Sequence, residues 1–448
     1  MTNHSEISWK GHLFKVGSHE GCFDEVPEKN VDLRKHIEPW LSAVFQSEHL
    51  SLLLGSGFTT AIAAQVDARS ADMGIPEIEG ESADKIKKAT EDSAKRSGRG
   101  LPNFEDHIRI ANELIRGYEI LGNKEADQLR QTLNRRLRAF LGSILESEQA
   151  VLEAFNKNDE KSLIARNLLI SFLLSFASRA TSRERLNLFT TNYDRLVEHG
   201  CDIAGLRVLD RFVGTLTPVF RASRLNIDLH YNPPGMRGEP RYLEGVVRFF
   251  KLHGSLDWRL EKRQIRRYGI PFGAPSDHPD IPREPLDSVM VYPNAAKDME
   301  TAEYPYAELF RDFAAAICRH NSVLVTYGYG FGDDHVNRVI RDMLTIPSTH
   351  LVIIAYGDPG RTDKEPGRIE RFCLGVGHEA QISLLIGSHF GNLPDLVASY
   401  LPKPAIDLIS ARQTELLKRR EVDPITPRPN DPDTPSMPPL GGDHADTN

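Results

Sequence analysis

The chain has 448 residues and a formal net charge of −8, from 55 Lys and Arg against 63 Asp and Glu. A dedicated nucleic-acid binder usually carries excess positive charge, so this balance argues against one. Hydrophobic residues make up 40% and charged residues 26% of the chain. These fractions are ordinary for a soluble globular protein and exclude collagenous, disordered and disulfide-scaffold classes for most of the chain. The length suits roughly two or three domains, or one large α/β domain with an insertion.

The cysteines and the apolar stretches indicate a soluble cytoplasmic protein that does not enter a membrane. No cysteine belongs to a C-x-x-C pair, which argues against a zinc ribbon or disulfide framework and fits a reducing compartment. The N-terminus is polar where a signal peptide needs a continuous apolar core. The longest apolar stretches, near 52–54 and 168–176, fall short of the roughly 20 residues of a membrane helix. The cysteines are Cys22, Cys201, Cys318 and Cys373.

The first strong strand is predicted at His49–Leu54. A polar, irregular stretch precedes it and ends in an amphipathic helix over 32–45. The strand runs directly into Gly55-Ser56-Gly57 and a helical segment, the order in which a phosphate-binding α/β unit begins. Residues 68–102 are polar and predict loop with fragments of helix.

A helical insertion is predicted between residues 103 and 178, where apolar residues recur three and four apart without any proline. This pattern indicates three or four helices. Continuously apolar strands then alternate with helices, as in a parallel sheet covered on both faces. A polar, Pro-containing excursion at 259–286 interrupts the alternation. The predicted strands are 186–192, 246–255, 288–294, 322–331, 349–356 and 381–387, and the predicted helices are 193–205, 307–320 and 334–344.

The C-terminal end differs in composition. Residues 408–420 could form one amphipathic helix, whereas residues 421–448 hold seven of the 28 prolines and few large apolar residues. Such a segment is expected to be disordered. The predicted organisation is an N-terminal extension (1–48), one α/β domain (49–402) with a helical insertion at about 103–180, and a C-terminal helix and tail (403–448).

Four polar or glycine-rich segments each come directly after a predicted strand. In an open parallel sheet the ligand lies outside the carboxyl ends of the strands, so these segments are expected to line one crevice. The first glycine turn would let the backbone approach a diphosphate while the next helix directs its free N–H groups at it. A tight turn without a ligand would use the same residues. The four segments are Gly55–Gly57, Thr190–Asp194, His253–Ser255 and Gly328–His335.

Within these segments His253 is the most informative residue. It stands at the exit of a buried strand, where an imidazole has the exposure and pKa range of a general base. The alternative is a histidine that is merely hydrogen-bonded at a strand end. Asn192 and Asp194 could cap a helix, or hydrogen-bond a ribose or position a water, and the two hypotheses are compatible.

The last segment, 328–337, combines three glycines with acidic residues that open a helix. It could be a flexible turn capped by Asp333 or Asp334, or a second wall of the pocket whose amides contact the adenosine side. Asn337 and His335 could instead lie at a subunit contact. We favour the pocket for the glycines and leave the other residues open.

A run of five basic residues lies between 259 and 267. It could contact nucleic acid, or it could be a solvated face or an oligomer contact. The acidic net charge provides no supporting field and favours the second interpretation. The run comprises Arg259, Lys262, Arg263, Arg266 and Arg267.

Taken together, these segments resemble the sirtuin-like NAD-binding superfamily, in the bacterial branch associated with defence against phage. LLLGSGFT is similar to the first glycine loop of the family and LFTTNYD to its Asn-x-Asp loop. KLHGSLDW is similar to its catalytic histidine loop and VTYGYGFGDDHVN to its late glycine loop. The segments occur in the family's order over roughly residues 50–345. The resemblance implies an α/β fold with a doubly wound parallel sheet, Rossmann-like and sirtuin-like, and an inserted helical subdomain.

Two departures from deacetylating sirtuins shape the expected activity. The chain lacks the four-cysteine module, so no zinc is expected and protein deacetylation is disfavoured. It also carries the long helical insertion that the defence members have. The resemblance therefore implies that the protein hydrolyses NAD+ as its substrate. It further implies that His253 is the base, that Asn192 orients water or ribose, and that Asp194 supports the nicotinamide ribose. The residues implied to bind the dinucleotide are Gly55, Ser56, Gly57, Thr59, Thr191, Gly328, Gly330 and Asp333.

Two other functions stay open. The chain could be a non-catalytic sensor of NAD or an ADP-ribose derivative, or a DNA-acting subunit of a defence complex. An unrestrained NAD+ hydrolase would drain the cofactor pool of its own cell, so a homo-oligomer with gated activity is expected. The resemblance further implies a HerA-type ATPase as the partner.

Overall fold

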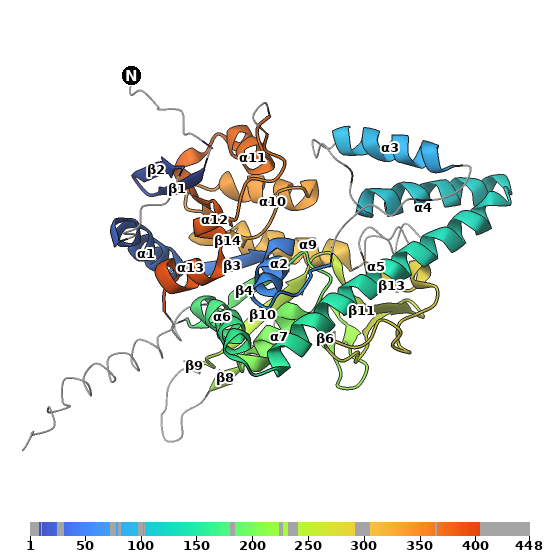
Figure 1. Cartoon of the computed structure of the whole chain (residues 1–448), viewed down its shortest axis with the longest axis horizontal. Helices are drawn as coiled ribbons and strands as arrows, with labels where there is room; N and C mark the ends of the chain where they lie inside the picture. The colour runs from blue at the N-terminus through green and yellow to red at the C-terminus, as the bar shows by residue number, and fades with distance from the viewer. Residues whose placement is uncertain are drawn as a thin grey trace, which may run out of the picture. The chain divides into compact units, whose positions relative to one another are not determined.

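The centre of the molecule is a nine-stranded sheet (Figure 1). The computed structural model describes residues 11–24, 31–71, 82–96, 104–179, 184–223, 227–231, 241–291, 305–362 and 365–403, with 9, 78 and 102. The predicted helix at 408–420 and the predicted disordered tail at 421–448 lie outside these residues. Across the sheet the strands are β2 (His19–Phe23), β1 (His12–Val16), β16 (Ile382–Ile386), β15 (His350–Ala355), β14 (Ser322–Tyr327), β3 (His49–Leu54), β4 (Leu186–Thr190), β10 (Val246–Lys251) and β5 (Arg207–Leu209).

From β16 to β5 the strands are all parallel, and helices cover both faces. Alternate residues of β3 contribute to two separate cores, with Leu52 and Leu54 on one face and Leu53 on the other. The predicted doubly wound α/β sheet is therefore confirmed. The first face is covered by α1 (Val31–Phe45), α2 (Ser56–Gln65), α6 (Glu160–Ala177) and α7 (Leu196–Ile203), and the second by α9 (Tyr306–Ile317), α10 (Asp334–Leu344) and α11 (Arg368–Val376).

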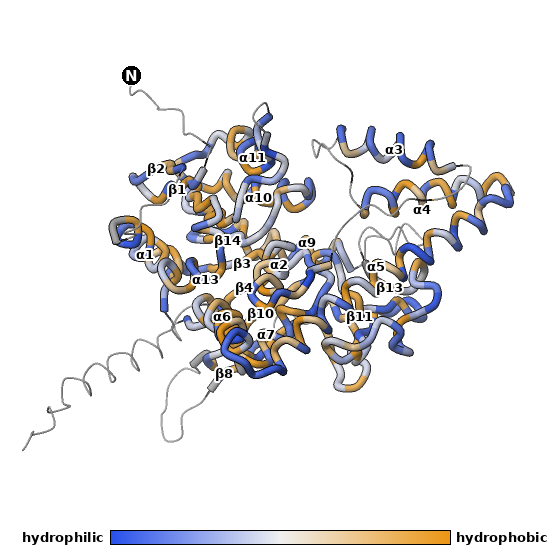
Figure 2. The backbone as a smooth tube through the Cα atoms, in the orientation of Figure 1, coloured by the Kyte–Doolittle hydropathy of each residue, from blue (hydrophilic) through white to orange (hydrophobic). Residues whose placement is uncertain are grey.

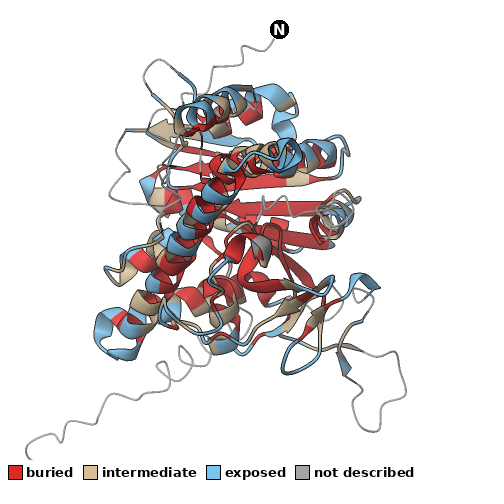
Figure 3. Cartoon of the chain, turned by 90° about the vertical axis from the view of Figure 1, so that its right-hand side faces the viewer, coloured by how far each residue is buried: buried red, intermediate tan, exposed pale blue. Residues whose placement is uncertain are grey.

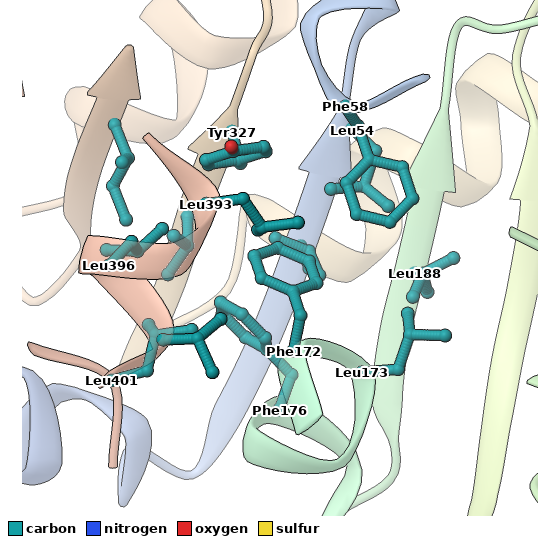
Figure 4. Packing of buried hydrophobic residues seen from close by; sticks show 14 of the residues in the cluster. Leu54, Phe58, Phe172, Leu173, Phe176, Leu188, Tyr327, Leu393, Leu396 and Leu401 are labelled. Atoms are coloured by element: carbon teal, nitrogen blue, oxygen red, sulfur yellow. The ribbon is translucent and has the colours of Figure 1, made fainter. Parts of the chain in front are cut away.

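Helix α6 packs its aromatic residues directly onto the centre of the sheet (Figure 4). The ring of Phe172 lies 5.2 Å from both Phe58 of α2 and Tyr327 of β14. The final helical turns pack against the same cluster through residues such as Leu396 (Figure 4). These turns are α12 (Ser388–Gly391), α13 (Leu393–Asp395) and a π-helical turn (Leu396–Tyr400).

Three further helices precede α6. They are α3 (Ala83–Arg96), α4 (Phe104–Leu121) and α5 (Glu125–Asn156). The rings of Phe104 and Phe140 stack 4.3 Å apart between α4 and α5, and Figure 2 shows the alternation of polar and apolar residues along α3. The predicted span 103–178 thus contains three helices, of which α6 belongs to the sheet layer. The stretch predicted as loop with helical fragments contains the 14-residue helix α3.

A second, antiparallel sheet was not predicted. Its centre is a hairpin that turns at Lys262 and Arg263, which have φ of 49° and 64°. Positive φ at both central residues matches the twist of the paired strands. The expected excursion at 259–286 thus begins as a hairpin, and the strand expected near 288–294 belongs to this sheet. The strands, in spatial order, are β13 (Val289–Val291), β11 (Gly254–Glu261), β12 (Gln264–Arg267), β7 (Val219–Phe220) and β6 (Phe212–Val213), and a separate pair is β8 (His230–Tyr231) with β9 (Arg241–Tyr242).

The expectation of an irregular N-terminal stretch is wrong for residues 12–23. Strand β1 pairs antiparallel with β16, and β2 pairs with β1, because Leu13, Phe14 and Val16 bury their side chains against the sheet. Figure 3 shows the central strands of the main sheet buried and the outer faces of the helices exposed. Among the helices that the structure describes, none has both the length and the apolar character needed to span a bilayer.

Candidate active site

The carboxyl ends of the neighbouring strands β14, β3, β4 and β10 meet at one edge of the sheet. A cavity of about 320 Å³ opens at this edge, within the usual range of small-molecule and cofactor sites. Nine of the eleven residues predicted for the site line it, whereas Gly57 and Gly328 do not. The nine are Gly55, Ser56, Thr59, Thr191, Asn192, Asp194, His253, Gly330 and Asp333.

Gly57 and Gly328 pack against each other below the cavity. A Cβ on Gly57 would lie 2.7 Å from the Cα of Gly328, and Gly328 has a φ of +62°. The N–H of Gly57 donates to the carbonyl of Gly328 (3.0 Å), and the N–H of Gly55 donates to Tyr327 (3.1 Å). These two amides therefore join the glycine loops to each other, and Ser56, in the first turn of α2, lines the cavity.

Thr59 connects Asn192 to Asp194. The amide Nδ2 of Asn192 donates to the carbonyl of Gly55 and to Oγ1 of Thr59, each at 3.0 Å. Thr59 in turn donates to Oδ2 of Asp194 (2.8 Å). Because both hydrogens of the amide are engaged, Asn192 can offer a ligand its Oδ1 acceptor.

Asp194 bonds to the start of a helix and also lines the cavity. Its Oδ1 accepts from the N–H of Leu196 at the start of α7 (3.1 Å), while its side chain lines the cavity. The Asn192 side chain is directed instead to Gly55 and Thr59. The capping hypothesis thus accounts for one of the two residues.

His253 is buried between two carboxylates. Its Nε2 lies 2.5 Å from Oδ2 of Asp333, and its Nδ1 lies 3.5 Å from Oε1 of Glu105. His253 is 5% exposed, so the expectation that it has the exposure of a general base at a strand exit is wrong. Asp333 is itself fixed, because its Oδ1 accepts from the N–H groups of His335 and Val336 at the start of α10.

The charges of these groups support one another. Burial alone would lower the pKa of His253, but the carboxylates of Asp333 and Glu105 outweigh it and raise the pKa to about 10. Burial would raise the pKa of Asp333, yet the imidazolium and the backbone N–H donors lower it to about 2. At neutral pH His253 in the free site is consequently an imidazolium, and it must lose a proton before it can act as a base.

Glu105 and Arg368 were missed in the sequence. Glu105 lies in the first turn of α4, where acidic residues are common for electrostatic reasons, so its sequence context gives no signal. Arg368 begins α11 and lines the cavity beside Gly332, where an added Cβ would lie 3.0 Å from the arginine Nη1. Among the described lining residues, Arg368 is the one Arg or Lys, and a guanidinium suits a phosphate.

Two buried cations fix the loop after β4 through hydrogen bonds and ion pairs. Lys251 donates to the carbonyls of Tyr193 and Asp194 and pairs with Glu198 (2.9 Å). Arg195 pairs with Glu148 of α5 at 2.5 Å, and both side chains are almost fully buried. The helical segment, which comprises α3, α4 and α5, and the main sheet therefore both position this loop.

A comparison with known protein families gives one match. Residues 186–374 match the family model described as SIR2-like domain. This match supports the sirtuin-like superfamily. SIR2-like domains are often NAD-dependent enzymes, so the match fits an NAD-related function and implies NAD binding. It includes Asn192, His253 and Asp333, whereas Gly55 and Glu105 lie outside it. No curated protein matches the chain.

Two further predictions concern a metal site and the basic run at 259–267. Within the part of the chain that the structure describes, no three His, Cys, Asp or Glu side chains form a group that could hold a metal ion. In the basic run, Arg259 is buried and donates to the carbonyl of Leu256. Arg267 pairs with Asp210. The run therefore lies along a hairpin, with one of its five side chains buried and another paired with an acidic residue.

Proposed function

We propose that this protein hydrolyses NAD+ at the bond between nicotinamide and ribose. The observation that carries the proposal is the meeting of Asn192, Asp194 and His253 in one cavity at the carboxyl edge of a doubly wound sheet. The first turn of α2 and Arg368 both line the cavity, and a helix N-terminus and a guanidinium are groups that bind the phosphates of a dinucleotide. Asn192 and Asp194 provide hydrogen-bond acceptors for ribose hydroxyls.

The reaction is balanced without an oxidant or reductant. The bond from C1′ to the nicotinamide nitrogen breaks, and its electron pair leaves with neutral nicotinamide. A water oxygen bonds to C1′, giving ADP-ribose, and one proton is released. The carboxylate of Asp194 stabilises the positive charge that develops on the ribose, Oδ1 of Asn192 orients the water or a ribose hydroxyl, and His253 accepts the proton.

His253 can become a base because the substrate changes its surroundings. The nicotinamide ring of NAD+ is cationic, and a like charge near an imidazolium lowers its pKa. The entering ring therefore favours loss of the His253 proton to solvent. His253 is thus an imidazolium in the free site and becomes a base after NAD+ has bound.

Purified full-length protein incubated with NAD+ tests this function. We expect nicotinamide and ADP-ribose to appear in equal amounts by chromatography. Saturable binding of NAD+ or ADP-ribose without either product would favour the alternative, a non-catalytic sensor. Salt-dependent binding of DNA is the corresponding result for a DNA-acting subunit.

We further propose that the enzyme acts in bacterial defence against phage by depleting NAD, as a homo-oligomer gated by a partner, with a HerA-type ATPase as the candidate. The proposal is supported by the contact of Glu105 with the candidate site, since helix contacts can shift and gate access. Light scattering and co-purification test the assembly. A monodisperse monomer with full NAD+ cleavage and no stable complex would contradict it.

We also propose that the protein needs no structural zinc and does not deacetylate peptides efficiently. Its four cysteines are far apart in the sequence, and a tetrahedral thiolate site needs four converging ligands. Stoichiometric zinc in chelator-washed protein, or NAD-dependent loss of acetyl groups from lysine peptides, would contradict this.

A further inference from the structure

One carboxylate reaches the candidate site from outside the sheet. Glu105 belongs to α4, yet it lines the cavity and its Oε1 lies 3.5 Å from Nδ1 of His253. The same oxygen accepts a 2.5 Å hydrogen bond from the hydroxyl of Tyr193, the residue between Asn192 and Asp194. Glu105 thus contacts two of the loops that carry the proposed catalytic residues.

We propose that the helical segment supplies a residue of the active centre: Glu105 is a positioning residue that holds the His253 ring through Nδ1. The inference rests on the proposed NAD+ hydrolysis, in which His253 accepts a proton. The two ring nitrogens of the imidazolium each face a carboxylate, Nδ1 that of Glu105 and Nε2 that of Asp333. The tautomer that remains after a proton is lost is set by these two partners.

The carboxylates of Asp333 and Glu105 are held in place by different contacts. Asp333 is fixed at the start of α10 by two backbone N–H donors. These contacts do not involve the helical segment. Glu105 is placed by α4 and by Tyr193, which burial and the Glu105 carboxylate keep protonated by raising its pKa well above the usual value. Tyr193 is therefore a donor that directs Glu105 toward His253.

Among the residues that the structure describes, charged and titratable groups from three parts of the chain face His253. Asp333 precedes α10, Glu105 comes from α4, and Tyr193 lies after β4, with its ring 6.2 Å from the imidazole. Asp194 and Arg368 line the same cavity. Removing the Glu105 charge leaves the Asp333 pair intact, so the His253 pKa should fall without reaching that of an isolated histidine.

A purely structural Glu105 would act only on helix stability. An acidic residue in the first turn of a helix is stabilising wherever its side chain points. The titration and tautomer of His253 separate the two roles, because only a positioning residue changes them.

The test compares Glu105→Gln with Glu113→Gln in the full chain. Gln is isosteric and can still accept from Tyr193, and Glu113 lies on the same helix with its side chain exposed beside Arg109. ¹⁵N-histidine NMR, with His253 assigned by His253→Gln, reports its titration and tautomer. The pH dependence of kcat/KM for NAD+ is measured on the same samples, and melting curves confirm folding.

We expect Glu105→Gln to lower the His253 pKa by about one pH unit or more, and to move the acid limb of kcat/KM by the same amount. Glu113→Gln should change neither. An unchanged His253 titration in Glu105→Gln, with NAD+ still cleaved, would overturn the inference. A lowered titration in a protein whose wild type cleaves no NAD+ would keep the Glu105 coupling and overturn the proposed function.

Discussion

The Nε2 atom of His253 lies 2.5 Å from Oδ2 of Asp333, the residue that also begins α10 through its other oxygen. This pair joins the loop after β10 to the loop after β14, across two intervening strands of the sheet. A buried ion pair of this kind ties the protonation of the site to the stability of the fold.

The pair predicts a specific pH dependence of stability. The pKa of His253 is raised from 6.5 to about 10, so the folded state binds a proton that the unfolded state has released. The stabilisation is fully present below about pH 6.5 and is lost as the pH rises through about 10, at up to about 1.4 kcal/mol per pH unit. Denaturant unfolding at a series of pH values should show a smaller decline in His253→Gln. An equal decline in both proteins would contradict the pairing.

Thr59 predicts a loss of activity without a loss of fold. Thr59→Val keeps the shape of the side chain but removes the hydroxyl that links Asn192 to Asp194. Misplacing either residue by a fraction of an ångström should lower kcat for NAD+ cleavage by about ten- to a hundredfold. Thr60→Val, in the same helix and with its hydroxyl bonded to the carbonyl of Ser56, tests whether any hydroxyl of α2 has this effect. Wild-type kcat in Thr59→Val would remove the link from the mechanism.

The positions of the main strands and of most site residues could be predicted from the sequence. Buried parallel strands are continuous apolar runs, and the residues directly after such strands lie at one edge of the sheet. Asn192, His253 and Gly330 therefore converge as expected. The hairpin at Lys262 and Arg263 was missed because its basic residues conceal the alternation of Leu260 and Ile265 on the buried side.

The contribution of the helical segment could not be predicted in the same way. Glu105 reaches His253 through the packing of α4 on α5 and of α5 beneath the loop after β4, and these contacts are between residues far apart in the chain. Amphipathic periodicity predicts a helix but not its partner. The sequence also could not predict the structural role of Gly57, which packs against Gly328.

The contact between the glycine loops predicts a difference between two glycines. Gly57→Ala places a Cβ 2.7 Å from the Cα of Gly328, so backbone must shift and the free energy of unfolding should fall by about 1–3 kcal/mol. Gly117→Ala in α4 meets no atom within 4 Å and should raise it by about 0.5–1 kcal/mol. Denaturant unfolding measures both. A neutral Gly57→Ala would show that the loops are not in close contact.

The buried pair of Glu148 and Arg195 predicts that α5 supports the site. Glu148→Gln leaves a buried guanidinium without its carboxylate, which should cost about 3–5 kcal/mol of unfolding free energy. Glu153→Gln, on the exposed side of the same helix, should change it by less than about 0.5 kcal/mol. Urea unfolding of the two variants provides the comparison. Equal, small effects would mean that the pair does not hold the loop after β4.

Nicotinamide release from NAD+ by the wild type, His253→Ala and Asn192→Ala tests the proposed hydrolysis directly. Each substitution removes a side chain at a strand exit, where it serves chemistry more than the core. We expect nicotinamide release by the wild type and its loss in both variants, with matching circular dichroism and cooperative melting, at a lower temperature in His253→Ala because the pair with Asp333 is lost. A wild type that releases no nicotinamide, or variants that release it at the wild-type rate, would contradict the proposed NAD+ hydrolysis at this site.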